Sequence, residues 1–382
     1  MTTKTETKAK IAFSATINRD PLLAAVARAR NVVEKRGTIP ILKNIRLACP
    51  EPGRLVVTGT DNDIEISESV ACECFGETTV DAEALAGLVQ RLPAGGEVSL
   101  TWGEDPRLIL KCGRSTYRLP VLPASDFPCM PTDDLSPPIE LDTDLFAGLI
   151  DKTAFAMSTD AARYYLQGVF LHQVVGGETG VLRCTATNGH QLGLANMPAP
   201  EGGLPANVII PTKTIREVVR VLGIAGETVT IAVSKTRIQL VAGGVTLTSR
   251  VIDGQFPDYE RVIPQENPHV ARIDRAMLKA CAERVLVLAR DRAGSIHLEI
   301  APGKATLTLK NVESGQGTEE LEVEYAGPEL KIGFNGHYLL DILGRIEAEA
   351  AEFHLGESGG TAVVIKDPLN ATTLFVIMPM RV

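Results

Sequence analysis

The sequence predicts an α+β protein made of three repeats, each with two helices packed on antiparallel sheet. Three observations predict this fold class. At 382 residues the chain exceeds a single domain of roughly 100 to 200 residues. Similar segments return in the same order at a period near one third of those 382 residues. Short alternating apolar runs, bounded by glycines, lie between amphipathic stretches with helical spacing.

Each repeat begins with a helix and a strand. Apolar residues at helical spacing predict the opening helices, and a change from polar to apolar residues marks the strand that follows. The helices are expected at 20–34, 143–157 and 275–288, and the strands at 43–47, 167–171 and 294–298.

A second amphipathic helix and a closing strand with a proline exit complete each repeat. The helices are expected at 80–92, 210–222 and 334–346, and the closing strands at 115–123, 245–252 and 372–379. Asp81, Thr212 and Asn335 are residues able to cap these helices, and Gly223 ends the middle one. Alternating runs between these anchors, such as 229–233 and 305–310, are typical of half-buried strands.

Two proline-rich stretches, 128–138 and 262–268, are typical of linkers between domains. We therefore expect three domains, and the first includes a polar N-terminal extension at 1–9. Their expected boundaries are 1–133, 134–263 and 264–382.

The composition is that of a globular protein, with 45% hydrophobic and 22% charged residues, which excludes a disordered chain. No apolar run approaches the ~18 residues of a membrane span, and residues 1–10 are polar and unlike a signal peptide. We expect a soluble protein in the cytoplasm.

The seven cysteines are an odd number spread over a long chain, which argues against a disulfide framework. Cys72 and Cys74 lie two apart in a strand-like run, which favours a buried pair over half of a metal site. The six histidines lack partners at metal-ligand spacing. We expect neither a metal nor another cofactor.

The sequence contains none of the common catalytic motifs, including the GxxxxGK phosphate loop, HExxH and GxSxG. One local group would suit an enzyme: His190, in the segment 187–191, with Asp160 and Arg163 upstream. Asn188 and Gly189 favour a hairpin turn there instead. We expect no active site, and a hydrolytic site around His190 is the alternative.

The net charge is −9, yet the charge is unevenly distributed. The six expected helices, with their flanking residues, sum to +2, so the remainder carries −11. Basic residues on these helices could face the phosphates of a nucleic acid, although singly each is more typical of a solvated helix face. They are Arg28, Arg30, Lys35, Arg36, Lys213, Arg216, Arg220, Arg275, Lys279 and Arg284.

Several segments together resemble the bacterial DNA polymerase III beta subunit family, the replication sliding clamps. They cover all three repeats in register, from about residue 10 to the last. The matching segments are PILKN at 40–44, GTDNDIE at 59–65, LPASDFP at 122–128, RYYLQG at 163–168, ATNGHQL at 186–192, DGQFPDY at 253–259 and MPMRV at 378–382.

The resemblance implies a homodimeric ring of twelve helices around duplex DNA, with the sheets outside. Twelve helices at ~9 to 10 Å spacing leave a hole of ~25 Å, which admits a duplex. The ring would tether the polymerase III alpha subunit, the clamp-loader complex, other polymerases and repair proteins, without membrane contact. Weak, sequence-independent contacts would suffice, because the DNA is enclosed. By resemblance Arg36, Tyr164 and Tyr165 touch DNA, and Arg28, Arg216 and Arg220 join them as basic helix residues.

The resemblance also implies an apolar cleft between the second and third domains that binds short partner peptides, as well as an apolar dimer contact. The cleft would use Leu166, Thr187, Gly189, His190, Leu192, Pro257, Arg261, Val262, Val376, Met378, Pro379, Met380 and Arg381. An ordinary closing strand is the alternative for 378–382. The dimer contact would use Tyr117, Leu119, Val287 and Leu288, for which burial within one chain is the alternative.

Three positions depart from the family pattern. Glu83 replaces a basic residue of a well-known member, and Asp160 replaces an uncharged polar one, which puts two DNA contacts in doubt. Gln191 replaces a common arginine, so any acidic contact at that rim of the cleft should be weaker.

Overall fold

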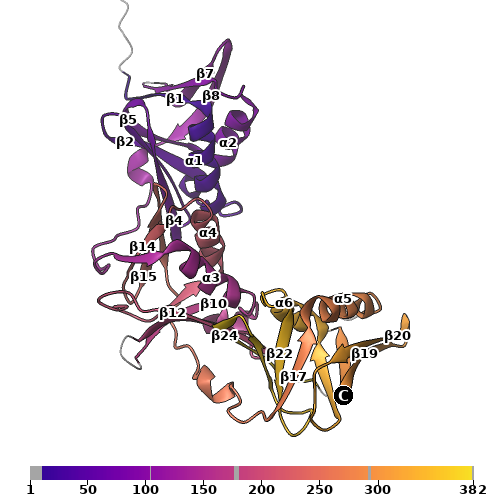
Figure 1. The fold of residues 1–382 in the computed structure, drawn as a ribbon. Helices are drawn as coiled ribbons and strands as arrows, with labels where there is room; N and C mark the ends of the chain where they lie inside the picture. Colours follow the sequence, from indigo (N-terminus) through magenta and orange to yellow (C-terminus); the bar gives the residue numbers. More distant parts are fainter. Residues whose placement is uncertain (1–10, 104, 176–179, 291–293, 381–382) are drawn as a thin grey trace, which may run out of the picture. The chain divides into compact units, whose positions relative to one another are not determined.

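The structure is a computed structural model that describes residues 11–103, 105–175, 180–290 and 294–380. These residues form two compact units, which are described in turn (Figure 1). The first unit comprises the chain up to residue 140 together with 220–250, and the second comprises 141–219 together with the chain from 251 onward.

One order of elements recurs three times along the chain: strand, helix, four strands, helix, three strands. The first copy runs from β1 to β8, the second from β9 to β16, and the third from β17 to β24. Each copy contains two α-helices and otherwise antiparallel strands. The predicted α+β class with a threefold repeat is therefore confirmed.

In the first unit, one continuous antiparallel sheet has the order β1-β6-β7-β8-β5-β2-β3-β4-β16-β15-β14. Pairing of β4 with β16 joins a strand of the first repeat to a strand of the second. The strands are β1 (Phe13–Asn18), β2 (Asn44–Glu51), β3 (Arg54–Thr60), β4 (Ile64–Ala71), β5 (Glu73–Asp81), β6 (Glu97–Trp102), β7 (Arg107–Cys112), β8 (Ser115–Leu122), β14 (Thr228–Val233), β15 (Arg237–Ala242) and β16 (Val245–Arg250).

Helices α1 (Arg19–Val32) and α2 (Ala82–Arg91) lie side by side against this sheet (Figure 1). Both begin at a side-chain cap, because Asn18 accepts a hydrogen bond from the backbone of α1 and Asp81 from that of α2. Their inward faces and the sheet form one apolar core that includes the fully buried Phe13, Leu22 and Leu85.

The second unit has two antiparallel sheets. The larger has the order β13-β10-β11-β12-β24-β23-β22-β17, and the smaller has the order β20-β19-β18-β21. The strands are β10 (Gly168–Val174), β11 (Val181–Thr187), β12 (Gln191–Pro198), β13 (Val208–Pro211), β17 (His269–Asp274), β18 (Ser295–Ala301), β19 (Gly303–Asn311), β20 (Gly315–Val323), β21 (Leu330–Asn335), β22 (Ala350–Leu355), β23 (Val363–Asp367) and β24 (Asn370–Ile377).

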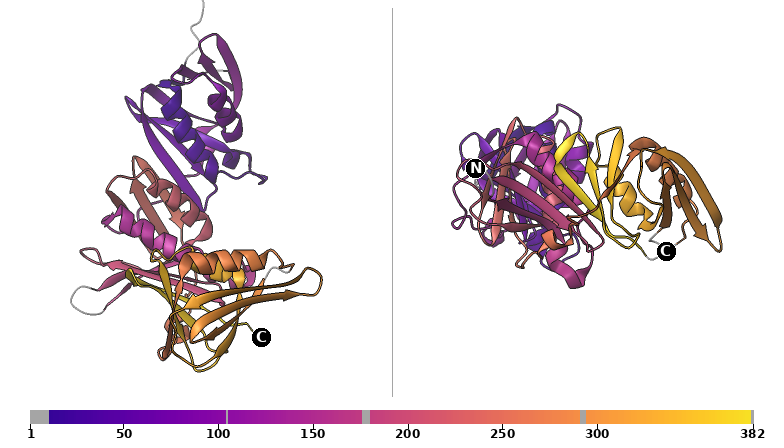
Figure 2. Two further views of the ribbon diagram at one scale, coloured as in Figure 1. Left: turned by 45° about the vertical axis from the view of Figure 1, so that its right-hand side comes forward. Right: turned by 60° about the horizontal axis from the view of Figure 1, so that its bottom comes forward.

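Helix α3 (Thr143–Ala154) packs on β10, β11 and β12, whereas α5 (Arg275–Leu286) packs on α6 (Gly336–Leu343) and lies across β19 and β20 (Figure 2). The sequence at the boundary between the units forms β9 (Ile139–Asp142) and α4 (Thr212–Leu222).

All six predicted helices exist, and each begins within two residues of its expected start. Several were predicted to end too late. Beyond α3 and α5 the backbone N–H groups of Ala156 and Leu288 bond to the carbonyl three residues back, so a tighter turn continues the apolar spacing after the α-helix has ended. Asp81 and Asn335 are confirmed as helix caps.

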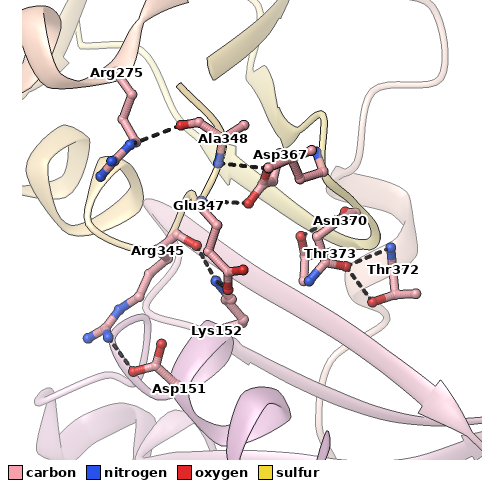
Figure 3. A network of polar contacts seen from close by, with 11 residues as sticks. Asp151, Lys152, Arg275, Arg345, Glu347, Ala348, Asp367, Asn370, Thr372 and Thr373 are labelled. Carbon is pink, nitrogen blue, oxygen red and sulfur yellow. Dashed lines mark hydrogen bonds and ion pairs between the residues drawn. The ribbon is translucent and has the colours of Figure 1, made fainter. Parts of the chain in front are cut away.

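The β12–β24 pairing joins the second repeat to the third, with Leu192 opposite Val376 and Leu194 opposite Leu374. A polar network strengthens this connection (Figure 3). The largely buried Lys152 donates from Nζ to the Arg345 carbonyl at 2.5 Å and to Glu347 Oε1 at 2.6 Å. Arg345 in turn pairs with Asp151. Backbone and side-chain bonds therefore connect the two repeats within this unit.

The prediction that Cys72 and Cys74 form a buried pair is wrong. Both thiols are half-buried, because Cys72 lies in the bend between β4 and β5, at the margin of the core. A third thiol lies beside them, since Cys49 Sγ donates to the Cys74 carbonyl at 2.9 Å. Among the described residues, no group of three or more His, Cys, Asp or Glu is arranged to hold a metal.

The described helices include none that is long and apolar enough to cross a membrane.

Candidate partner-binding cleft

A largely apolar cavity of about 290 Å³ lies over the β12–β24 pair in the second unit. This volume suits a few apolar side chains of a ligand. Its floor comes from β12 and β24, and its walls come from three connecting segments. The lining residues are Arg163, Tyr165, Leu166, Thr187, Gly189, His190, Gln191, Leu192, Pro257, Asp258, Tyr259, Val262, Val376 and Met378.

One wall is the turn between β11 and β12, which local hydrogen bonds fix. Asn188 Oδ1 accepts from the backbone N–H of His190 at 2.9 Å and of Gln191 at 3.0 Å. Thr187 Oγ1 donates to the Gln191 carbonyl at 2.7 Å. Gly189 has φ of +89°, a conformation that favours glycine. The predicted Asn-Gly hairpin is therefore confirmed.

A second wall is the linker that follows the second repeat, ending in the short 3-10 helix Tyr259–Val262. Stacked rings anchor this segment. The ring centroids of Phe256 and Phe170 are 4.8 Å apart, and those of Phe170 and His172 are 4.2 Å apart. The hydroxyl of Tyr259 meets His172 Nε2 at 2.8 Å and accepts from Arg183 Nη1 at 3.1 Å. Burial lowers the pKa of His172 to about 4, so this ring is neutral at pH 7.

The structure brings most of the predicted cleft residues together. Those that line the cavity are Leu166, Thr187, Gly189, His190, Leu192, Pro257, Val262, Val376 and Met378. Three others lie outside the lining. The Arg261 side chain is 83% exposed and pairs with Asp258 at 2.7 Å, and Pro379 and Met380 follow the end of β24, where the Met380 N–H donates to Gly333. Arg381 lies outside the described residues.

Two aromatic residues line the cleft although the sequence did not predict them there. Tyr259 is largely buried and forms part of the wall, and Tyr165 was expected only at DNA. The sequence signal for Tyr259 was the DGQFPDY segment itself, in which an aromatic residue follows a proline turn. Its place in the wall depends on Phe170, His172 and Arg183, which are distant in sequence.

Gln191 has a structural role at the rim, because the residue is only 3% exposed. Its amide donates to the Phe155 carbonyl at 3.4 Å and also bonds Asp341. Burial raises the pKa of the Asp341 carboxyl, and the hydrogen bond from Gln191 and the charge of Arg345 oppose that shift. A neutral amide therefore occupies the position at which the family resemblance implied an arginine.

Three family models match the chain in succession: the N-terminal domain of the DNA polymerase III beta subunit at 13–131, its central domain at 140–258 and its C-terminal domain at 260–381. The beta sliding clamp of Caulobacter vibrioides is 46% identical over 373 residues, which cover 96% of this chain and 99% of the relative. That of Escherichia coli K12 is 32% identical over 371 residues, with the same shares.

This chain belongs to the beta sliding clamp family.

Solved structures agree with this assignment. A Caulobacter crescentus beta sliding clamp has a TM-score of 0.94 at 44% identity and covers 97% of this chain and 99% of its own. A Bartonella birtlesii sliding clamp bound to griselimycin has a TM-score of 0.93 at 34% identity, covering 97% and 100%. The chain thus has the three-domain fold of a beta sliding clamp and functions as a DNA sliding clamp in replication.

The hydrolytic alternative around His190 finds no support in this clamp. The imidazole is exposed and stacks on Tyr338 with 6.4 Å between ring centroids, and the His190 carbonyl accepts from the Met378 N–H. The side chain of Asp160, the carboxylate that would orient it, pairs with Arg163 at 2.9 Å.

The residues expected at DNA differ in their exposure. Arg28 is engaged within the chain, since its guanidinium meets both oxygens of Glu68 at 2.6 and 2.7 Å. Arg36, Arg216 and Arg220 are exposed, and Tyr164 is 52% exposed and packs edge-on against Tyr165.

The departures Glu83 and Asp160 each form ion pairs inside the chain. Glu83 pairs with Arg30 at 2.8 Å and with Lys35 at 3.8 Å, so it offsets two cations that were expected to face DNA. Asp160 caps the following 3-10 helix by accepting from the Ala162 backbone. That backbone hydrogen bond and Arg163 hold the pKa of the Asp160 carboxyl below its usual value.

The residues expected at the dimer contact are exposed to different degrees. Val287 is 78% exposed, and Leu288 packs partly against the core of the third repeat. Tyr117 is half-buried beside the core of the first repeat, and Leu119 is part of that core at 8% exposure. Apolar surface for a partner therefore comes chiefly from Val287.

Proposed function

We propose that two copies of this chain close into a ring around duplex DNA and hold replication and repair proteins on it through short peptides. The cavity over β12 and β24 is the observation that carries the peptide part of the proposal. It is apolar, it has the size of a few side chains, and it contains most of the residues that the family resemblance implied.

The peptide surface suits varied partners. Met378 and Val262 are 40% and 52% exposed, and a flexible methionine adapts to different apolar side chains. Arg163 and His190 at the rim offer donors for peptide carbonyl groups. We propose the polymerase III alpha subunit, the clamp-loader complex, other polymerases and repair proteins as occupants.

For DNA, the proposal relies on weak contacts from exposed cations, chiefly Arg36, Arg216 and Arg220, with Tyr164 and Tyr165. Such contacts are sequence-independent and permit sliding, because enclosure rather than affinity retains the ring. The ring would close where Tyr117 and Leu119 of one copy meet Val287 and Leu288 of the other.

We further propose that the chain has no enzymatic activity of its own, works in the bacterial cytoplasm and depends on an ATP-driven loader for opening. The proposed domains are 1–133, 134–263 and 264–382. The family matches at 13–131, 140–258 and 260–381 lie close to these boundaries.

Retention on DNA of different topology tests the ring. The chain, loaded by the clamp loader of the same cell onto nicked circular plasmid, should co-elute with the DNA in gel filtration. Cutting the circle with a restriction enzyme should release it, since a ring slides off free ends. A plasmid lacking the cut site is the control. Persistence on linear DNA would contradict enclosure.

A further inference from the structure

Equivalent positions in the first and third repeats follow from their strand pairings. In the first repeat, one row of opposed residues crosses β1, β6, β7 and β8: Ala15, Leu100, Leu110 and Tyr117. In the third repeat, the same row crosses β17, β22, β23 and β24: Ala271, Phe353, Ile365 and Phe375. Phe375 is therefore the counterpart of Tyr117. Phe155 and Val287 are counterparts too, since they are the C-cap residues of α3 and α5.

The contact proposed between two copies thus has a counterpart inside the chain, at the junction of the second and third repeats. There the rings of Phe155 and Phe375 contact each other, with 5.9 Å between their centroids. The proposed contact would join Val287 of one copy to Tyr117 of the other, which are the same two positions. The internal junction can therefore serve as a template for the contact between copies.

An ion pair accompanies the two rings at the internal junction. Asp151 of α3 pairs with Arg345, which follows α6 (Figure 3). Asp151 is the ninth residue after the N-cap Asp142, and Arg345 is the tenth after the N-cap Asn335. The position of each charge is therefore defined relative to the start of its helix.

The equivalent positions at the contact between copies also carry opposite charges. Glu283 is the ninth residue after Asp274, the N-cap of α5, and Arg91 is the tenth after Asp81, the N-cap of α2. At the junction of the first and second repeats the equivalent positions hold two apolar residues, Ala27 and Val221. A charge on one side thus always faces an opposite charge, and an apolar residue faces an apolar one.

Glu283 is available for a partner. Its side chain is 54% exposed, and the nearest cation in an ion pair with it is Lys279, at the long distance of 4.0 Å. Its neighbour in sequence, Arg284, is engaged elsewhere, because its guanidinium meets both carboxylate oxygens of Glu319 at 2.8 Å. The cations on its own helix therefore leave the Glu283 carboxylate largely unneutralised.

Arg91 is available as well. It is exposed at the end of α2 and has no ion pair among the described residues. One Nη1 hydrogen bond, to the Gly87 carbonyl at 2.8 Å, leaves most of its donors free. Arg19, which binds carbonyls at the same helix end, is already paired with Asp20 at 2.8 Å.

We propose that Glu283 of one copy forms an ion pair with Arg91 of the other at both contacts of the ring. The pair sets the orientation in which the two copies meet, because a different orientation would leave both charges unmatched. This inference rests on the proposed homodimeric ring, to which it adds two specificity-determining residues outside the apolar contact.

Two charge-reversal variants, Glu283→Arg and Arg91→Glu, test the pair because they can be mixed. In a ring made of either variant alone, like charges face each other at both contacts. In a mixed ring, one contact has the native pair and the other has the reversed pair, so both are attractive. A defect in folding would persist in the mixture, since each copy keeps its substitution.

Fluorescence energy transfer between donor- and acceptor-labelled copies, measured over a dilution series at low salt, gives the dimer dissociation constant. Each variant alone should dimerise about five- to thirtyfold more weakly than the unaltered chain, because two contacts change from attraction to repulsion between exposed charges. The mixture should return to within about threefold of the unaltered chain. These differences should shrink at high salt, which screens exposed charges.

A second pair of variants separates this contact from net charge. Glu201→Arg and Lys235→Glu carry the same charge changes at exposed turn positions. Alone or mixed, they should dimerise like the unaltered chain.

The outcomes distinguish the two proposals. Unchanged dimerisation in Glu283→Arg or Arg91→Glu, no recovery in their mixture, or an equal preference for mixed rings in the control pair would overturn the ion pair and leave the ring standing. If the unaltered chain forms no dimer at any concentration, the proposed ring is wrong and the ion pair is overturned with it.

Discussion

At the scale of single residues, His172 shows how a buried polar group positions the cleft. Its ring stacks on Phe170 and its Nε2 meets the hydroxyl of Tyr259, so it supports the linker wall from beneath. Burial keeps the imidazole neutral, because a charged ring in this apolar setting would lose its hydration.

This burial predicts an acid sensitivity. The pKa of His172 falls from 6.5 in the unfolded chain to about 4 in the folded chain, so the unfolded state takes up a proton first as the pH falls. The contribution of the neutral His172 ring to the free energy of unfolding is fully present above pH 6.5 and is lost as the pH falls from that value to about 4. Lowering the pH from 7.5 to 5 should therefore reduce the free energy of unfolding by roughly 2 kcal/mol through this group.

Urea unfolding of the unaltered chain and of His172→Phe at the two pH values measures the effect. The phenylalanine keeps the stacked ring but does not titrate, so the variant should lose roughly 2 kcal/mol less on acidification. His337→Gln, at an exposed position, is the control and should behave like the unaltered chain. An unchanged acid sensitivity in His172→Phe would contradict the role of this ring.

The residues of the cleft differ in how far the sequence predicted them. Leu166, Leu192 and Met378 follow from motifs that align with the family, so their place was predictable. Tyr165 and Tyr259 were not assigned to the cleft, because their burial depends on packing between segments distant in sequence. The ion pairs of Glu83 and Arg28 also depend on long-range geometry.

At the scale of elements, the turn between β11 and β12 forms one rim of the cleft. Gly189 has φ of +89°, and a Cβ there would lie 2.6 Å from Arg163 Nη1. Arg163 is flexible enough to withdraw, but the left-handed backbone is unfavourable for any other residue by roughly 1–2 kcal/mol.

Gly189→Ala should therefore destabilise the chain by about 1 kcal/mol and also weaken peptide binding, because relief of the strain moves the rim. Thermal unfolding and peptide anisotropy measure the two effects. Gly148→Ala, inside α3 with open space around it, is the matched control: it should leave peptide affinity unchanged and slightly stabilise the helix. Unaltered peptide affinity in Gly189→Ala would show that the turn does not shape the cleft.

Element positions were the most predictable part of the fold. Helical apolar spacing and capping residues such as Asp81 fixed the helix starts, because both signals are local. The helix ends were less predictable, since a tighter turn keeps the same apolar residues inward. The pairings β4–β16 and β12–β24 join distant segments, and no local pattern in the sequence specifies them.

At the scale of the whole molecule, the proposed function depends on a diffuse positive field rather than on any single contact. Arg36 and Arg216 are exposed, and exposed charges contribute little to folding. Reversing the charge at both arginines should therefore change DNA loading far more than it changes stability.

Arg36→Glu with Arg216→Glu should reduce the amount of protein loaded on circular DNA severalfold at moderate salt, and shift the melting temperature by no more than about 2 °C. Lys235→Glu with Lys331→Glu carries the same change in net charge on exposed turn and strand residues and should load normally. A collapse in stability, or equal loss of loading in both double variants, would contradict a DNA-facing role for the two arginines.

The strand pairings between successive repeats have a mechanical consequence for the proposed ring. Separating the first repeat from the second at β4–β16, or the second from the third at β12–β24, would break a row of backbone hydrogen bonds at once. The contact between two copies would rely on a few apolar side chains and one ion pair. A force applied by the loader would thus separate the two protomers before it separated the paired strands within either chain. DNA would therefore enter the ring through the opened contact between the two protomers.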